Sequence, residues 1–180
     1  QKLGAKLRLG KKLGQDFTLG ELKKQGYDAV FLGVGAPAGV SLGLKKEQEA
    51  GVVEAIDFLR EYNLTGQAKV GRQVVVVGGG NAAVDAARTA LRLGAQSVTV
   101  VYRRTRAEMP AYAEEVEEAE KEGVKFEFLA APLELEVNKG GLAAVRCRRM
   151  ELGEFDRSGR RKPVSKGAEF RLDADTLIAA

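Results

Sequence analysis

The chain has 180 residues, which is enough for one domain with a core of its own, or for one domain and part of a second. Its 29 basic and 25 acidic residues leave a net charge of only +4 and are interleaved along most of the chain, so no basic surface for nucleic acid is predicted. Cys147 is the only cysteine and there is no histidine, which excludes an internal disulfide, a thiolate zinc site within one chain, and nucleophilic dyads that use histidine.

The sequence also shows no apolar run near the ~20 residues that a membrane-spanning helix needs, and no signal peptide. We therefore expect a cytoplasmic protein that has no membrane segment. Position 1 is glutamine instead of methionine, from which we expect a piece of a longer protein.

The first part of the chain carries mixed signals. Residues 1–20 are rich in lysine, leucine and glycine without a clear period, and residues 20–24 predict one short helical turn. The apolar residues 27–32 lead into the glycine-rich residues 33–37, which predicts a buried strand followed by a tight turn. Residues 38–46 are expected to form a loop.

A helix is predicted for residues 47–62. Val52, Ile56 and Leu59 recur at spacings of four and three, as on the apolar face of a helix. The Asn-Leu-Thr-Gly sequence of residues 63–66 is expected to end it.

The strongest pattern in the chain is a strand–turn–helix–strand unit. Residues 74–77 are four consecutive valines, typical of a parallel strand buried on both faces. Three glycines follow, then a helix pattern over residues 81–93 that Gly94 ends, and then a second strand over residues 97–102. The unit has the length of about 30 residues that is expected of a βαβ crossover.

Pro110 is predicted to open a further helix that stops at Gly123. Tyr112, Val116 and Ala119 form its narrow apolar stripe, and its acidic face is expected to be solvated.

The rest of the chain predicts further strands, with turns between antiparallel segments. Residues 124–128 and 133–137 alternate as half-exposed strands, turns are expected at residues 138–141 and 156–159, and residues 176–180 predict a last buried strand. The predicted fold class is therefore α/β: a Rossmann-like, three-layer NAD(P)-binding domain with a parallel sheet plus a small antiparallel β-hairpin layer.

The glycine turn predicts a dinucleotide site. Gly78 permits the tight turn, Gly80 lets the backbone approach a pyrophosphate, and the small side chain of Ala83 lets helix and strand pack closely. Free N–H groups and the helix dipole then favour the diphosphate. The predicted cofactor-binding residues here are Gly78, Gly79, Gly80, Asn81, Ala82 and Ala83. The alternative is a glycine-rich turn that merely packs.

Cofactor choice is predicted from the end of the second strand. An NAD site usually places Asp or Glu there for the ribose 2′-hydroxyl, but this chain has Tyr102 followed by Arg103 and Arg104. Guanidinium groups bind a 2′-phosphate that a carboxylate would repel, so Arg103 and Arg104 predict NADPH. The alternative is two solvated surface arginines, and Arg106 could simply be exposed.

Other polar residues are given lesser roles. Asn81 is expected near the diphosphate, with a plain N-cap as the alternative, and Asp85 is expected to be a structural anchor. Cys147 is interpreted as a packing residue, and Asp173 and Asp175 are assigned no chemistry. No catalytic side chain and no metal site are predicted.

Residues 74–104, followed by Glu-Met-Pro-Ala at 108–111, resemble the NADPH-binding domain of the glutamate synthase small-subunit (beta-subunit) family of FAD-dependent pyridine-nucleotide oxidoreductases. Residues 27–35 resemble that family's FAD-domain strand before the NADPH insertion, residues 150–161 its hairpin, and residues 174–178 the strand that returns to the FAD domain. The family's N-terminal glycine fingerprint for FAD and its cysteine-rich iron–sulfur sites have no counterpart in this sequence.

The resemblance implies a division into residues 1–46, a remnant of an FAD-binding domain with a linker, and residues 47–180, the NADPH-binding domain. It implies hydride transfer from NADPH to an FAD held only in the full-length enzyme. The implied partners are the rest of the FAD domain and an iron–sulfur or glutamate-synthase-type large subunit, and the isolated domain is expected to be inactive. A non-catalytic interaction module with a vestigial fold, and an NADPH domain like that of a disulfide reductase, are the alternatives.

Overall fold

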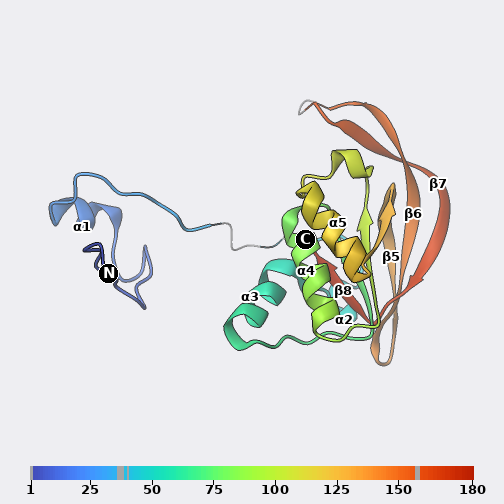
Figure 1. Cartoon of the computed structure of the whole chain (residues 1–180), viewed down its shortest axis with the longest axis horizontal. Coiled ribbons are helices and arrows are strands. Elements are labelled where there is room, and N and C mark those ends of the chain that lie inside the picture. The colour runs from blue at the N-terminus through green and yellow to red at the C-terminus, as the bar shows by residue number, and fades with distance from the viewer. Residues whose placement is uncertain (1, 36–38, 40, 157–158) are drawn as a thin grey trace. The chain divides into compact units, whose positions relative to one another are not determined.

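The computed structural model describes residues 2–35, 39, 41–156 and 159–180. The chain divides into two compact units, residues 1–36 and residues 37–180. Figure 1 shows the helices and strands of each unit. Among the described residues, no helix combines the length and the apolar character that a membrane crossing needs.

The first unit contains one short helix, α1, over Leu19–Lys24, where a helical turn is predicted. A capping box begins it: the Glu21 N–H donates to Thr18 Oγ1, and the Glu21 carboxylate accepts from the Thr18 N–H. This reciprocal pair explains why so short a helix starts at this point.

The buried strand predicted for residues 27–32 is wrong. Residues 29–35 have no regular structure, and Phe31 is 95% exposed. No described strand pairs with this segment, and without a neighbour its apolar side chains have nothing to pack on. Of the turn expected after it, residues 36 and 37 lie outside the described residues, as do residues 38 and 40 of the expected loop; residues 41–44 are irregular.

The second unit is built around a five-stranded sheet in which all neighbouring strands are parallel, in the order β1-β8-β2-β3-β4. Its strands are β1 Val53–Glu54, β2 Gln73–Val77, β3 Ser97–Tyr102, β4 Lys125–Phe128 and β8 Thr176–Ala179. The predicted strands at residues 74–77, 97–102 and 176–180 are thus confirmed. The last of them lies between β1 and β2 and not at an edge.

The helices of this unit are α2 Glu47–Ala50, α3 Ala55–Thr65, α4 Asn81–Arg92 and α5 Ala113–Glu122, with a short 3₁₀ helix at Arg106–Glu108. The single helix predicted for residues 47–62 is wrong. Gly51 has φ 65°, a left-handed conformation that stops α2, and Val53 then pairs with Ile178 in the sheet before α3 starts. The end predicted at residues 63–66 is confirmed, because Gly66 caps α3 with φ 72°.

Helix α5 starts three residues later than predicted from Pro110. The Ala111 N–H donates to the Gly79 carbonyl at 3.1 Å, and the Tyr112 N–H donates to Asn81 Oδ1 at 3.0 Å. These bonds hold the chain outside the helix, so Tyr112 becomes the N-cap and is 67% exposed instead of belonging to the apolar stripe. Val116 and Ala119 are buried, as predicted.

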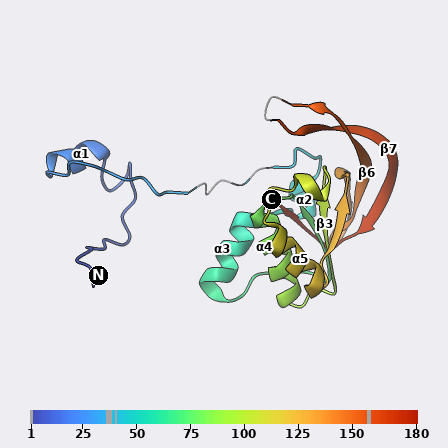
Figure 2. The ribbon, with the colours of Figure 1, turned by 45° about the horizontal axis from the view of Figure 1, so that its top comes forward.

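A second, antiparallel sheet has the order β5-β6-β7. Its strands are β5 Ala130–Asn138, β6 Gly141–Phe155 and β7 Arg161–Asp173. Strand β5 pairs only with residues 141–149 of β6, so β6 and β7 continue beyond it as a two-stranded hairpin, which Figure 2 shows as a long curved arm. The turn predicted at residues 138–141 is confirmed, with Asn138 Oδ1 accepting from the Gly140 N–H. In the turn predicted at 156–159, residues 157 and 158 lie outside the described residues.

Alternating side chains of the parallel sheet separate two cores. On one face, Val74 and Val76 pack in a cluster with Phe58 of α3, Val84 of α4 and Val116 of α5. Helices α3, α4 and α5 therefore form one layer (Figure 1).

On the other face, Val75 and Val101 pack in a second cluster with Leu135 and Val145 of the antiparallel sheet. The result is three layers: helices, parallel sheet and antiparallel sheet. The predicted Rossmann-like α/β fold with an added antiparallel layer is confirmed.

Candidate functional site

A cleft of about 470 Å³ lies at the carboxyl ends of β8, β2 and β3. The chain leaves β2 towards β3 on one side, and β8 returns on the other side, so strand order reverses at β2. Ligands of open α/β sheets bind at the carboxyl ends of the strands at such a switch point. The cleft wall includes Gly78, Gly79, Tyr102, Arg103, Arg104 and Arg160.

The first two glycines of the turn are required by their neighbours. Gly78 has φ 156°, and a Cβ on it would lie 2.7 Å from the Ala180 carbonyl oxygen and 3.1 Å from Ala83 Cβ. A Cβ on Gly79 would overlap the ring of Tyr102. The close packing of turn, helix and strand predicted for Gly78 and Ala83 is therefore present.

The third glycine lies beside open space. A Cβ built on Gly80 meets nothing within 4 Å. Among the described residues, none accepts a hydrogen bond from the backbone N–H groups of residues 79–82. These four donors lie at the N-terminus of the 12-residue helix α4, where the helix dipole adds positive potential. The turn can therefore cradle an anionic group.

A segment that the sequence interpretation left without a site role covers this turn. The Tyr102 hydroxyl donates to the Glu108 carbonyl at 2.8 Å, and the Ala111 N–H donates to the Gly79 carbonyl at 3.1 Å. Asn81 Oδ1 accepts from the Tyr112 N–H, so Asn81 is not an N-cap; that position belongs to Gly80. The Glu-Met-Pro-Ala sequence at residues 108–111 indicates this segment only through the family resemblance, because its residues form no binding motif of their own.

The two arginines that are predicted to bind the 2′-phosphate have different surroundings. Arg103 is exposed, lines the cleft, and forms no hydrogen bond or ion pair with any described residue. The Arg104 side chain is only 5% exposed: its Nε donates to the Arg161 carbonyl at 2.8 Å, and its Nη2 lies 3.3 Å from Asp156 Oδ2. The expectation of a solvated surface arginine therefore fits Arg103 alone, since Arg104 is bound to the β6–β7 hairpin.

A second cleft, of about 540 Å³, lies on the hairpin side of these arginines. It is lined by Arg103, Arg104, Phe155, Asp156, Lys162 and Pro163. The hairpin residues in the two clefts were not predicted as site residues, because they are more than 50 positions along the chain from β3. Arg106 is outside both clefts and pairs with Glu120 at 2.6 Å.

The polar residues that were given no binding role lie outside both clefts. Asp175 accepts hydrogen bonds from the backbone N–H groups of Arg72 and Gln73, which join β8 to the start of β2. Cys147 is fully buried in the second core, and this burial raises the pKa of its thiol to about 12. Its interpretation as a packing residue is confirmed. Asp85 is exposed. In the described part of the chain, no three His, Cys, Asp or Glu side chains are grouped as metal ligands.

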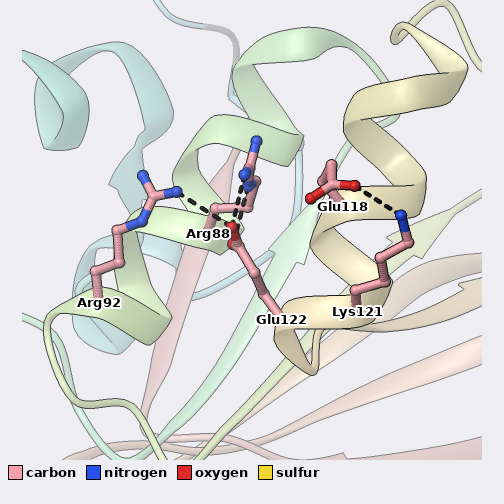
Figure 3. Close-up of polar contacts among 5 residues, drawn as sticks. All are labelled: Arg88, Arg92, Glu118, Lys121 and Glu122. Atoms are coloured by element: carbon pink, nitrogen blue, oxygen red, sulfur yellow. Dashed lines mark hydrogen bonds and ion pairs between the residues drawn. The ribbon is translucent and has the colours of Figure 1, made fainter.

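The acidic face of α5 is largely exposed, as predicted, and one of its carboxylates also pairs with α4. Glu122 accepts from Arg88 Nε at 2.9 Å and from Arg88 Nη2 at 2.6 Å, while Arg92 lies 3.3 Å away (Figure 3). Glu118 pairs with Lys121 within α5. The hydrogen bonds from Arg88 lower the pKa of Glu122. This cluster holds α5 against the helix that begins at the glycine turn.

Comparison with known proteins places the chain among redox enzymes. The model of the family described as pyridine nucleotide-disulphide oxidoreductase matches residues 4–180. The beta subunit of the NADP(+)-dependent formate dehydrogenase of Moorella thermoacetica is 46% identical over 182 residues, which cover 99% of this chain and 26% of that protein. The NADPH glutamate synthase small chain of Escherichia coli is 39% identical over 191 residues, which cover 99% of this chain and 40% of that protein.

Among solved structures, the thioredoxin reductase of Lactococcus lactis matches with a TM-score of 0.60 and 20% identity, over 79% of this chain and 41% of that chain. At this identity the match shows the fold alone. The resemblance to the glutamate synthase small subunit is confirmed, and the chain spans between a quarter and two-fifths of the length of these two relatives. The chain belongs to the pyridine nucleotide-disulphide oxidoreductase family.

Proposed function

We propose that this chain contains the NADPH-binding domain of a flavin-dependent oxidoreductase, and that it positions NADPH for hydride transfer to FAD in the full-length enzyme. The observation that carries the proposal is the backbone N–H groups of residues 79–82 at the start of α4, which donate to no described residue. They lie at the same strand ends as the exposed cation Arg103. A dinucleotide with a 2′-phosphate has anionic groups for both features.

The residues present fit the diphosphate of this cofactor. The N–H groups of Gly79, Gly80, Asn81 and Ala82 donate to it, and the open side of Gly80 lets it approach the backbone. Asn81 acts on the site indirectly, because its side chain holds the segment that covers the turn. When bound, NADPH supplies the hydride, and this domain contributes binding and orientation.

The preference for NADPH over NADH rests on the end of β3. A carboxylate that would accept from a ribose 2′-hydroxyl is replaced by Tyr102, whose own hydroxyl is used on the Glu108 carbonyl. Arg103 then offers a guanidinium group to the 2′-phosphate, with Arg104 beside it in the cleft wall. The names of the two relatives, which specify NADP(+) and NADPH, support this choice.

We assign residues 47–180 to the NADPH-binding domain and residues 1–46 to part of an FAD-binding domain with a linker. FAD belongs to the full-length protein in this proposal, and the electrons pass from it to an iron–sulfur partner or a glutamate-synthase-type large subunit in the cytoplasm. The isolated chain is then a binding domain without turnover.

Calorimetric titration of the 180-residue chain with NADPH and NADH tests the proposal. NADPH is expected to bind more tightly, and Arg103→Ala to reduce NADPH affinity by about tenfold or more, since a charge-assisted hydrogen bond contributes ~1.5–3 kcal/mol. Arg106→Ala is the matched control, because Arg106 pairs with Glu120 away from both clefts. Equal affinities for the two cofactors would contradict the NADPH assignment. No response to either would favour a non-catalytic interaction module.

A further inference from the structure

The β6–β7 hairpin contributes residues to the walls of both clefts beside Arg103, where the 2′-phosphate is expected. Arg160, just before β7, lines the same cleft as Arg103 and the glycine turn. Lys162, the next cation but one, lines only the second cleft, which none of the three glycines borders. Arg160 is therefore the hairpin cation that shares the first cleft with both Arg103 and the glycine turn.

The backbone on both sides of the Arg160 side chain is fixed by hydrogen bonds. The Arg160 N–H donates to Asp156 Oδ1 at 3.2 Å, and the Asp156 N–H donates to the Arg160 carbonyl at 2.7 Å. The Arg161 carbonyl, one residue further, accepts from Arg104 Nε at 2.8 Å. Asp156 Oδ2 accepts from Arg104 Nη2, so Arg104 holds both Asp156 and Arg161.

Arg104 is thus better placed to hold the hairpin than to bind a ligand. Its side chain is 5% exposed, and a buried guanidinium needs its partners. Arg103 is exposed one residue earlier on the same strand end and has no partner among the described residues. The adjacent arginines therefore divide two tasks, one facing the solvent cleft and one facing the hairpin.

We propose that the 2′-phosphate subsite is shared between β3 and the hairpin: Arg103 and Arg160 bind the phosphate, and Arg104, through Asp156 and the Arg161 carbonyl, positions Arg160. This inference rests on the proposed NADPH function and adds a ligand from a distant segment. It also gives the antiparallel layer a role in cofactor choice, because a hairpin that is released from Arg104 would take Arg160 out of the cleft.

The test compares 2′,5′-ADP with 5′-AMP on the 180-residue chain, because the two probes differ by the 2′-phosphate. Arg160→Ala is expected to weaken 2′,5′-ADP by about tenfold and to leave 5′-AMP unchanged. Lys166→Ala is the matched control: it removes the same charge from β7, where Lys166 pairs with Glu151. Wild-type affinity of Arg160→Ala for 2′,5′-ADP would overturn the proposal.

Two further variants separate positioning from charge. Asp156→Ala makes the site more positive, so electrostatic attraction alone would strengthen 2′,5′-ADP binding, whereas the positioning role predicts weaker binding. Arg104→Lys keeps the charge but loses the fork that holds two acceptors, and it is also expected to weaken 2′,5′-ADP selectively. Asp156→Ala alone answers the question if Arg104→Lys does not fold. Unchanged or tighter 2′,5′-ADP binding by Asp156→Ala would refute the positioning role.

Binding by the wild-type chain shows whether a negative result refutes the proposed function or only the hairpin subsite. If the wild-type chain binds neither NADPH nor 2′,5′-ADP, the proposed function fails, and the inference fails with it. If wild type binds both, and Arg103→Ala but no hairpin variant reduces binding of 2′,5′-ADP, the hairpin subsite alone is refuted.

Discussion

Replacing Gly80 with alanine separates cofactor binding from folding. The residue has φ −90° and ψ 175° at the N-cap of α4, a conformation that alanine adopts, and its Cβ would meet nothing within 4 Å. We expect a loss of folding free energy below about 1 kcal/mol, the usual range for N-cap changes. The new methyl group instead occupies the open side where the diphosphate is expected, so NADPH affinity should fall by about tenfold or more.

Gly78→Ala is the matched comparison, because the same change is made two residues earlier. There a Cβ would lie 2.7 Å from the Ala180 carbonyl oxygen, at a positive φ. Such strain costs ~1–3 kcal/mol, which corresponds to a fall in melting temperature of roughly 2–12 °C. Thermal unfolding by circular dichroism and NADPH titration measure the two effects. Wild-type NADPH affinity in Gly80→Ala would refute the assignment of the turn.

Three further outcomes are expected. Glu122→Gln should lower the free energy of unfolding by about 0.5–1 kcal/mol at neutral pH. Because the pKa of Glu122 is lowered in the folded state, the contribution of its carboxylate is lost as the pH falls through that pKa. A stability difference between wild type and variant that persists in acid would contradict the ion-pair explanation. Cys147, whose buried thiol has its pKa raised to about 12, should react with a thiol reagent at neutral pH only after denaturation; fast labelling of the native chain would show that the packing is wrong. The purified chain should be colourless, because residues 27–35 pair with no described strand; a stoichiometric flavin spectrum would place FAD in this chain.

The sequence predicts correctly those elements whose structure is decided by residues close together in the chain. The valines of β2, the glycine turn and α4 follow one another within 20 positions, and each pattern has one stable interpretation. The close contact of Gly78 with Ala83 follows from the turn itself. The fold class and the close-packed glycine turn could therefore be predicted before any tertiary contact was known.

The secondary-structure predictions are wrong where pairing with residues far along the chain decides the structure. Residues 27–32 carry a strand pattern, but a strand needs a neighbour, and none of the described strands pairs with it. Residues 47–62 have helical spacing throughout, but the helix ends at Gly51, and Val53 forms a strand because it pairs with Ile178. The pattern alone could not show that residues 53 and 54 would pair with a strand about 125 positions further along the chain.

The two arginines show the same limit within the site. Arg103 and Arg104 are equivalent in sequence, and both were predicted to bind a phosphate. Their difference comes from Asp156 and the Arg161 carbonyl, more than 50 positions along the chain, which surround Arg104 and not Arg103. Among the described residues, only the hydrogen bonds from Arg104 to the hairpin distinguish its buried guanidinium from the exposed one of Arg103.

A crystal structure of the chain with NADP⁺ tests the central claim most directly. The diphosphate is predicted to accept hydrogen bonds from the backbone N–H groups of residues 79–82, with the 2′-phosphate against Arg103. A cofactor whose diphosphate lies away from this turn, or whose 2′-phosphate lies away from Arg103, would contradict the account.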